Sequence, residues 1–162
     1  MEIVAKPLNA EEFAPFGDVL DATGEADIII NQGMCERFHD RAELDFGEGG
    51  RAGISIFHAK TRALPHTLDM VERHPEGSQA FIPLSQDPFL VVVASDDDGL
   101  PDTPLAFVAN AGQGINLHRG VWHGVLCPLG QCGIFAVVDR IGDTKNLQEH
   151  WFTTDFVISS GQ

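Results

Sequence analysis

The chain has 162 residues, of which 43% are hydrophobic and 21% are charged, and these values are typical of a folded protein rather than a disordered one. The length suits a single domain, which we expect over residues 1–162. Asp and Glu number 24 against 10 Lys and Arg, so the formal net charge is -14. A surface with this charge repels phosphate backbones and anionic lipids, which argues against nucleic-acid and membrane partners.

The cysteines and the apolar runs favour a cytoplasmic protein. Cys35, Cys127 and Cys132 are odd in number and form no Cys-x-x-Cys pair, so a reducing compartment is the simpler interpretation. The first residues lack the basic segment of a signal peptide, and we expect none. The longest apolar run, at residues 89–94, is too short to cross a bilayer.

One short helix is predicted near the start of the chain. Asn9 is a suitable N-cap, and Glu11 and Glu12 would lie in the first turn, where acidic side chains stabilise a helix. Pro15 would lie near its end.

The rest of the chain is predicted to be mainly β. Short apolar runs alternate with turn signals, and Gly and Pro are frequent between them, at 17 and 9 residues. This pattern favours an all-β sandwich or barrel. Residues 95–104 are acidic and are predicted to form an exposed loop. The predicted strands include residues 28–30, 53–59, 64–70, 80–84, 89–94, 105–109 and 133–138.

The stretch from Leu64 to His74 has a strand period with a polar end. Read at period two, one face begins with apolar residues and finishes with Glu72 and His74. This face would suit a barrel interior that opens into a polar pocket. The alternative is that the strand simply ends at the surface.

Two motifs favour the pocket. Glu72-x-His74-x₄-Gln79 and His118-Arg-Gly-Val-Trp-His123 resemble, in order and spacing, the two histidine motifs of cupins. The resemblance implies a cupin-like β-barrel with flanking strands and one or two short helices. It places Glu72, His74, Gln79 and His123 where cupins hold a metal. Imidazole and carboxylate groups suit a divalent cation such as Ni²⁺, although a site without metal remains open.

The amino-acid sequences of several segments resemble one family more closely. Residues 72–84 and 116–123 are similar to the two signature stretches of ureidoglycolate lyases, and residues 31–40 and 138–140 resemble further segments of that family. The resemblance runs from about Pro7 to about Asn146. It implies an enzyme of purine (allantoin) breakdown, often a homodimer, that splits ureidoglycolate into glyoxylate and urea. The family usually has Tyr at Leu117, and His-Pro where this chain has Gly124 and Val125.

These comparisons define the candidate site, with two rival functions left open. The rivals are another metal-dependent cupin enzyme and a small-molecule-binding cupin without catalysis. The candidate catalytic residues are His74, His123, Glu72 and His118. The candidate substrate-binding residues are Gln79, Asn31, Arg37 and Arg140. The candidate metal ligands are Glu72, His74, Gln79 and His123.

Overall fold

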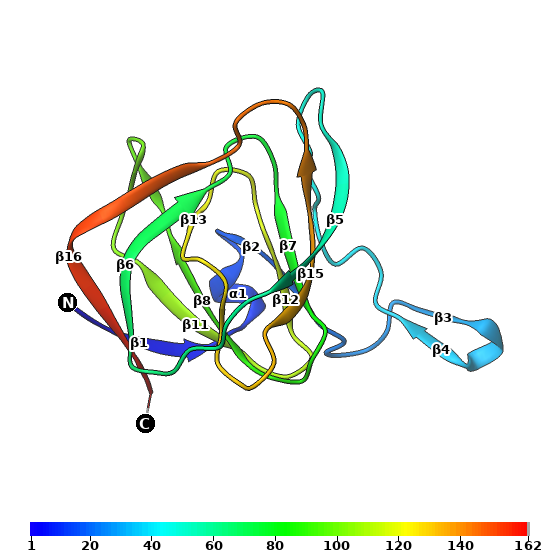
Figure 1. The fold of residues 1–162 in the computed structure, drawn as a ribbon. Coiled ribbons are helices and arrows are strands. Elements are labelled where there is room, and N and C mark those ends of the chain that lie inside the picture. Colours follow the sequence, from blue (N-terminus) through cyan, green and yellow to red (C-terminus); the bar gives the residue numbers. More distant parts are fainter. Residues whose placement is uncertain (162) are drawn as a thin grey trace.

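The computed structural model describes residues 1–161, and β-strands are its main secondary structure. The larger sheet has the strand order β11-β1-β16-β6-β13-β8-β14 (Figure 1). Because β11 also pairs with β8, six of these described strands close on themselves as a barrel. The strands are β1 (Glu2–Pro7), β6 (His66–Arg73), β8 (Phe89–Ala94), β11 (Leu105–Ala109), β13 (Trp122–His123), β14 (Cys127–Pro128) and β16 (Gln148–Ser160).

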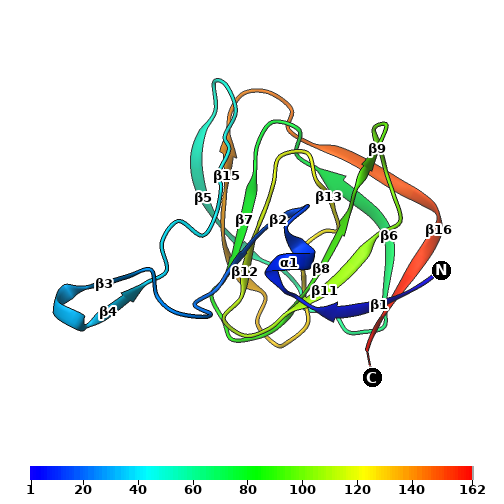
Figure 2. The same ribbon diagram turned by 180° about the vertical axis from the view of Figure 1, so that it is seen from behind.

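A second, antiparallel sheet faces the closed one (Figure 2). Its order is β2-β12-β7-β15-β5, so β5 is an outer strand. Its strands are β2 (Gly17–Leu20), β5 (Arg51–His58), β7 (Gln79–Pro83), β12 (Gly114–Leu117) and β15 (Ile134–Ile141).

Short elements complete the chain. Helix α1 (Ala10–Phe13) begins as predicted, with the Asn9 side chain accepting a hydrogen bond of 2.9 Å from the Glu12 backbone N–H. The strands β3 (Ile28–Ile30) and β4 (Cys35–Arg37), with the 3₁₀ turn η1 (Asn31–Gly33) between them, form a hairpin that projects from the body (Figure 1). Strands β9 (Asp96–Asp97) and β10 (Leu100–Pro101) form a short exposed hairpin within residues 95–104, for which the acidic sequence predicts an exposed loop. None of the helices within residues 1–161 has the length and apolarity that a membrane span requires.

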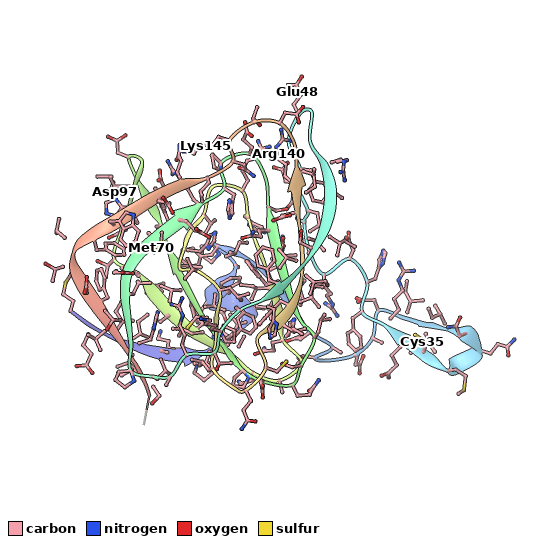
Figure 3. All side chains as sticks on the ribbon, in the orientation of Figure 1. Cys35, Glu48, Met70, Asp97, Arg140 and Lys145 are labelled. Carbon is pink, nitrogen blue, oxygen red and sulfur yellow. The ribbon has the colours of Figure 1, made fainter. Side chains whose placement is uncertain are left out.

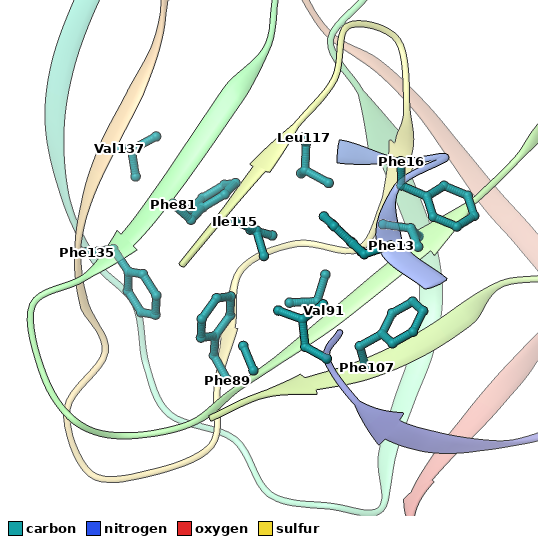
Figure 4. Packing of buried hydrophobic residues seen from close by; sticks show 13 residues of the cluster. Phe13, Phe16, Phe81, Phe89, Val91, Phe107, Ile115, Leu117, Phe135 and Val137 are labelled. Carbon is teal, nitrogen blue, oxygen red and sulfur yellow. The ribbon is translucent and has the colours of Figure 1, made fainter. Parts of the chain in front are cut away.

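The main core lies between the two sheets. Phe81, Ile115 and Phe135 of the smaller sheet pack with Val91 and other buried residues of the larger one (Figure 4). Strand β8 is buried along its whole length because alternate side chains enter this core and a second one. The second core comes mainly from the closed sheet, and includes Leu90, Val92, Trp122, Phe156 and Ile158. This arrangement confirms the predicted mainly β, cupin-like barrel with flanking strands.

Candidate functional site

The central cluster consists of Glu72, His74 and His123. Strand β13 pairs with β6 so that His123 stands directly opposite Glu72, and His74 follows β6 immediately. One ligand atom from each of the three residues lies within 4.8 Å of the others. The imidazole centroids of His74 and His123 are 5.3 Å apart. Segments about fifty residues apart in the sequence therefore converge, as the two motifs predicted.

Each imidazole is oriented by a backbone carbonyl. The Nδ1 atom of His74 lies 2.7 Å from the carbonyl oxygen of Asn146, and Nδ1 of His123 lies 3.0 Å from that of Gly124. A carbonyl oxygen only accepts hydrogen bonds, so in the neutral rings Nδ1 carries the proton. The Nε2 lone pairs are then free to accept a proton or to bind a cation. Backbone carbonyls orient metal-binding histidines in the same way.

Three buried acceptor atoms in this region have no donor among the described residues. They are Nε2 of His74, Nε2 of His123 and Oε1 of Gln79. Gln79 donates through Nε2 to Asp139 at 3.1 Å, which leaves its carbonyl oxygen free. Burial of a polar atom without a partner is costly, so these acceptors favour a cation or a hydrogen-bond donor as occupant.

Gln79 faces the interior from the opposite sheet. Its cross-strand neighbour Leu117 is a core residue, and directly paired residues share a face. Leu117 also lines a small apolar cavity of about 20 Å³ together with His123 and Gly124. The positions at which the chain departs from the family pattern, Leu117 and Gly124, thus line the same small cavity as one of the two imidazoles.

The electrostatics of the cluster separate its members. Burial, with a smaller contribution from His74, lowers the pKa of His123 to about 4, so this imidazole is neutral near pH 7. Burial raises the pKa of the Glu72 carboxyl; His74 opposes the rise and Glu149 adds to it. Glu72 is therefore better suited to carry a proton near neutral pH than an exposed carboxylate.

The buried neutral His123 predicts acid sensitivity of the metal-free protein. An unfolded histidine has a pKa of about 6.5, so between pH 6.5 and 4 the unfolded state binds one more proton than the folded state. The free energy of unfolding therefore decreases as the pH is lowered through this range. The loss reaches about 3 kcal/mol near pH 4. Glu72 has the opposite sign, because its raised pKa favours the folded state in acid. Urea unfolding with EDTA from pH 7 to pH 4 should therefore show a smaller acid loss for His123→Gln than for the wild type. Equal losses would contradict the prediction.

His118 lies outside the cluster. Ile115 and Leu117 point into the core, so Asn116 between them points to the outer side of the smaller sheet. His118 is two residues after Asn116 and therefore belongs to the same outer side. There its Nε2 atom lies 3.1 Å from Oδ2 of Asp18, which also accepts a hydrogen bond of 2.9 Å from Asn116. A catalytic role for His118 stays a prediction.

Three of the predicted substrate-binding residues, Arg140, Asn31 and Arg37, also lie away from the cluster in this single chain. Arg140 lies near the end of β15 (Figure 3). It alternates with the interior-facing Asp139 and so belongs to the outer side of the sheet, and its guanidinium donates at 2.5 Å to the carbonyl of Phe46. Asn31 and Arg37 are exposed on the projecting hairpin. The structure therefore brings together Glu72, His74 and His123, with Gln79 facing the same interior, and leaves the other four candidates outside.

Sequence reasoning missed Asn146. Besides orienting His74 through its carbonyl, it accepts a hydrogen bond of 2.7 Å from the backbone N–H of Glu76 through its side chain. Asn146 therefore holds the loop that carries His74. No motif marks this residue, because it comes from the connection before β16.

The fold is a cupin-like barrel, made of the closed β-sheet and the antiparallel sheet that faces it. The imidazole–carboxylate cluster between the two sheets is typical of an enzyme active site or a metal site. The family model for ureidoglycolate lyase matches residues 1–159. Ureidoglycolate lyase of Rhodobacter capsulatus is 58% identical over 148 residues, which cover 91% of this chain and 92% of that protein. Ureidoglycolate lyases of Mesorhizobium japonicum and a Chelativorans species are 51% and 48% identical, and each comparison covers at least 96% of both chains. The chain belongs to the ureidoglycolate lyase family.

Proposed function

We propose that this protein is an enzyme that cleaves ureidoglycolate to glyoxylate and urea, in the breakdown of purines through allantoin. The observation that carries the proposal is the cluster of Glu72, His74 and His123, which lies between the two sheets of this chain. The chain that holds this cluster is a member of the ureidoglycolate lyase family. Family membership favours this activity over that of another cupin enzyme or a binding module.

The reaction requires one proton to move while one bond breaks. The substrate carbon bears a hydroxyl, a carboxylate and a urea nitrogen. As the hydroxyl loses its proton and becomes the aldehyde oxygen of glyoxylate, the carbon–nitrogen bond breaks and its electron pair leaves with the nitrogen. That nitrogen takes up a proton and departs as urea, so no water is consumed.

Residues of the cluster fit these steps. Glu72, whose pKa is raised by burial, accepts the hydroxyl proton and returns it to the departing nitrogen. The Nε2 atoms of His74 and His123 accept hydrogen bonds from substrate O–H and N–H groups, because both rings are held with Nε2 free. Fixed acceptors of this kind hold the substrate in the reactive pose.

The donor set also fits a divalent cation such as Ni²⁺. The carboxylate of Glu72 and the Nε2 atoms of His74 and His123 would hold it, with Oε1 of Gln79 as a further neutral ligand. Such an ion, when bound, supplies Lewis acidity that lowers the pKa of the substrate hydroxyl. A carboxylate has two oxygens, so ligation through one leaves the other free to accept the proton.

Further parts of the proposal concern the environment of the enzyme. Its three cysteines are unpaired, which supports a reducing compartment, the cytoplasm. We also propose that residues 1–162 form one domain. The family resemblance supports a homodimer. Asn31, Arg37, Arg140 and His118 remain proposed contributors to substrate binding or catalysis, and variants can test each.

Product analysis tests the reaction. Purified protein incubated with racemic ureidoglycolate should release glyoxylate and intact urea in equal amounts, since elimination leaves the urea group whole. Both products can be followed enzymatically in the same sample. Ammonia and CO₂ in place of urea would show hydrolysis of the amide and would contradict the proposal.

A further inference from the structure

Two further polar side chains, Gln79 and Asp139, lie together on the interior side of the smaller sheet. Phe135 and Val137 of β15 point into the core, so Asp139, two residues further along, belongs to the same side of the sheet (Figure 4). Cross-strand pairing sets Asp139 directly opposite Gln79 of β7. The Nε2 atom of Gln79 donates a hydrogen bond of 3.1 Å to Oδ2 of Asp139. We call these two residues the amide–carboxylate pair.

The amide–carboxylate pair faces the same interior as the imidazole–carboxylate cluster. On strand β12, Leu117 is the residue directly opposite Gln79. Leu117 lines one small cavity together with His123. Residues paired across neighbouring strands share a face of the sheet, so Gln79 and Asp139 are turned toward this interior as Leu117 is. A substrate held at the cluster is therefore bordered by the pair on the facing sheet.

Hydrogen-bond chemistry fixes which atoms of the pair remain free. An ionised carboxylate only accepts hydrogen bonds, so the Gln79 amide must turn its NH2 group toward Asp139 and leave Oε1 free. Oε1 of Gln79 is buried, and no donor within residues 1–161 reaches it. Asp139 forms no ion pair with a Lys or Arg of these residues, and a carboxylate accepts several hydrogen bonds. The pair thus presents two adjacent acceptors, an amide oxygen and a carboxylate.

The free polar atoms on both sides of this interior are acceptors. On the larger sheet they are the carboxylate of Glu72 and the Nε2 atoms of His74 and His123. On the smaller sheet they belong to Gln79 and Asp139. A ligand that satisfies them carries N–H or O–H donors at several points. Ureidoglycolate has two N–H donors on the terminal nitrogen of its urea group, whereas its other end is a carboxylate.

We propose that Gln79 and Asp139 form the subsite for the urea group of the substrate, in which Oε1 of Gln79 and the carboxylate of Asp139 accept hydrogen bonds from the terminal NH2 group. Two adjacent acceptors match the two N–H bonds of one amide nitrogen. The negative charge of Asp139 attracts these donors and repels the substrate carboxylate, so it also orients the substrate. An amide oxygen has two lone pairs, which leaves Oε1 able to ligate a cation as well. This inference rests on the proposed function and assigns the residues that select the urea group.

Inhibition by the two products tests the subsite. Asp139→Asn replaces one carboxylate oxygen with an NH2 group of the same shape, and the remaining oxygen can still accept the hydrogen bond from Gln79. The inhibition constant of urea should rise about 10–100-fold, the value of a hydrogen bond to a charged group. The inhibition constant of glyoxylate should stay within about threefold or fall, because a repulsive charge has been removed. A merely structural defect would weaken both products alike.

The matched control is Asp143→Asn. Asp143 is exposed in the connection after β15, and its replacement changes the charge of the chain by the same amount. Both inhibition constants should equal those of the wild type in this variant, because exposed charges at a distance are screened by salt.

A substrate analogue provides a second readout in the same proteins. N-acetyl-α-hydroxyglycine has a methyl group in place of the terminal NH2 group, and its cleavage to glyoxylate and acetamide breaks the same type of bond. The ratio of kcat/KM for ureidoglycolate to kcat/KM for this analogue should be at least about tenfold smaller in Asp139→Asn than in the wild type. A ratio measured in one preparation does not depend on the folded fraction, so partial unfolding cannot produce this change.

The outcomes separate the subsite from the reaction. If the wild type cleaves ureidoglycolate, an unchanged urea inhibition constant in Asp139→Asn, equal weakening of both products, or an unchanged substrate ratio would overturn the subsite and leave the proposed reaction standing. A wild type that releases no glyoxylate and urea would overturn the proposed reaction and the subsite together.

Discussion

Replacing His123 with Ala is expected to lower kcat by about 10²–10⁴-fold, because its Nε2 holds the substrate in place for proton transfer by Glu72, and an acid–base group typically contributes that factor. The Nε2 atom of this imidazole is buried and free of protein donors, so its removal leaves a gap where the substrate or a cation is held. His74→Ala should behave in the same way, since its Nε2 is held alike. If the two act as a unit, the double variant should be little worse than either single one. Steady-state release of glyoxylate measures all three.

Two further histidine variants make this test specific. His150 contacts Trp122 and Phe152 through its ring on β16, outside both motifs, so His150→Ala should keep kcat within about a few-fold of the wild type. His118→Ala reports on the residue bonded to Asp18, and a large loss there would show that it reaches the reaction. All variants must first be shown to be folded. Near-normal turnover in both His74→Ala and His123→Ala would mean that the two motifs specify the fold but not the active site.

Divalent cation affinity should fall strongly when a ligand is removed. His74→Ala or His123→Ala is expected to weaken Ni²⁺ binding by at least about 100-fold, because even the loss of groups that only orient a ligand costs 10–100-fold. Asp139→Ala, which frees the Gln79 amide, should have a smaller effect of about tenfold, the lower end of that range, because Gln79 is a neutral ligand. Calorimetric titration of chelator-treated protein with Ni²⁺ measures the affinity directly and does not require turnover.

The pH dependence of binding provides a second readout. The pKa of His123 is lowered to about 4, so its Nε2 should remain unprotonated, and able to bind a cation, down to about pH 4. A control variant, His58→Ala, changes a histidine on the exposed side of β5 and should bind Ni²⁺ like the wild type. Wild-type protein that binds no cation, or His74→Ala and His123→Ala variants that bind it undiminished, would refute the metal assignment and leave proton transfer as the function of the cluster.

Local sequence determined much of the secondary structure. Strands β8 and β11 have the predicted bounds, because each is a continuous apolar run between turn residues. Asn9 determined where α1 begins, since a side-chain cap acts within three residues. Strand β16, the longest, was not predicted. Its register shifts between Trp151 and Phe156, so a period-two pattern is interrupted there, and pairing with β6 and β1 stabilises it.

The candidate site was predictable where residue type and spacing carried the signal. Glu72, His74 and His123 stand in two motifs, and the structure places their ligand atoms together. Asn146 could not have been found in this way, because its contribution is a backbone carbonyl that every residue possesses. Its place beside His74 depends on the path of the connection before β16.

The sequence by itself determined which residue types occur and how they alternate along each strand. Only the tertiary structure decided which alternate set faces the interior. Asp139 and Arg140 are neighbours, and either charged side chain would suit a polar site. Asp139 accepts a hydrogen bond from Gln79 in the interior, whereas Arg140 lies on the outer side. The phase is set by pairing with β5 and β7, strands distant in sequence, and a shift of one residue would exchange the two faces. The direction of a side chain in a sheet is thus a long-range property, whereas the strand itself is largely a local one.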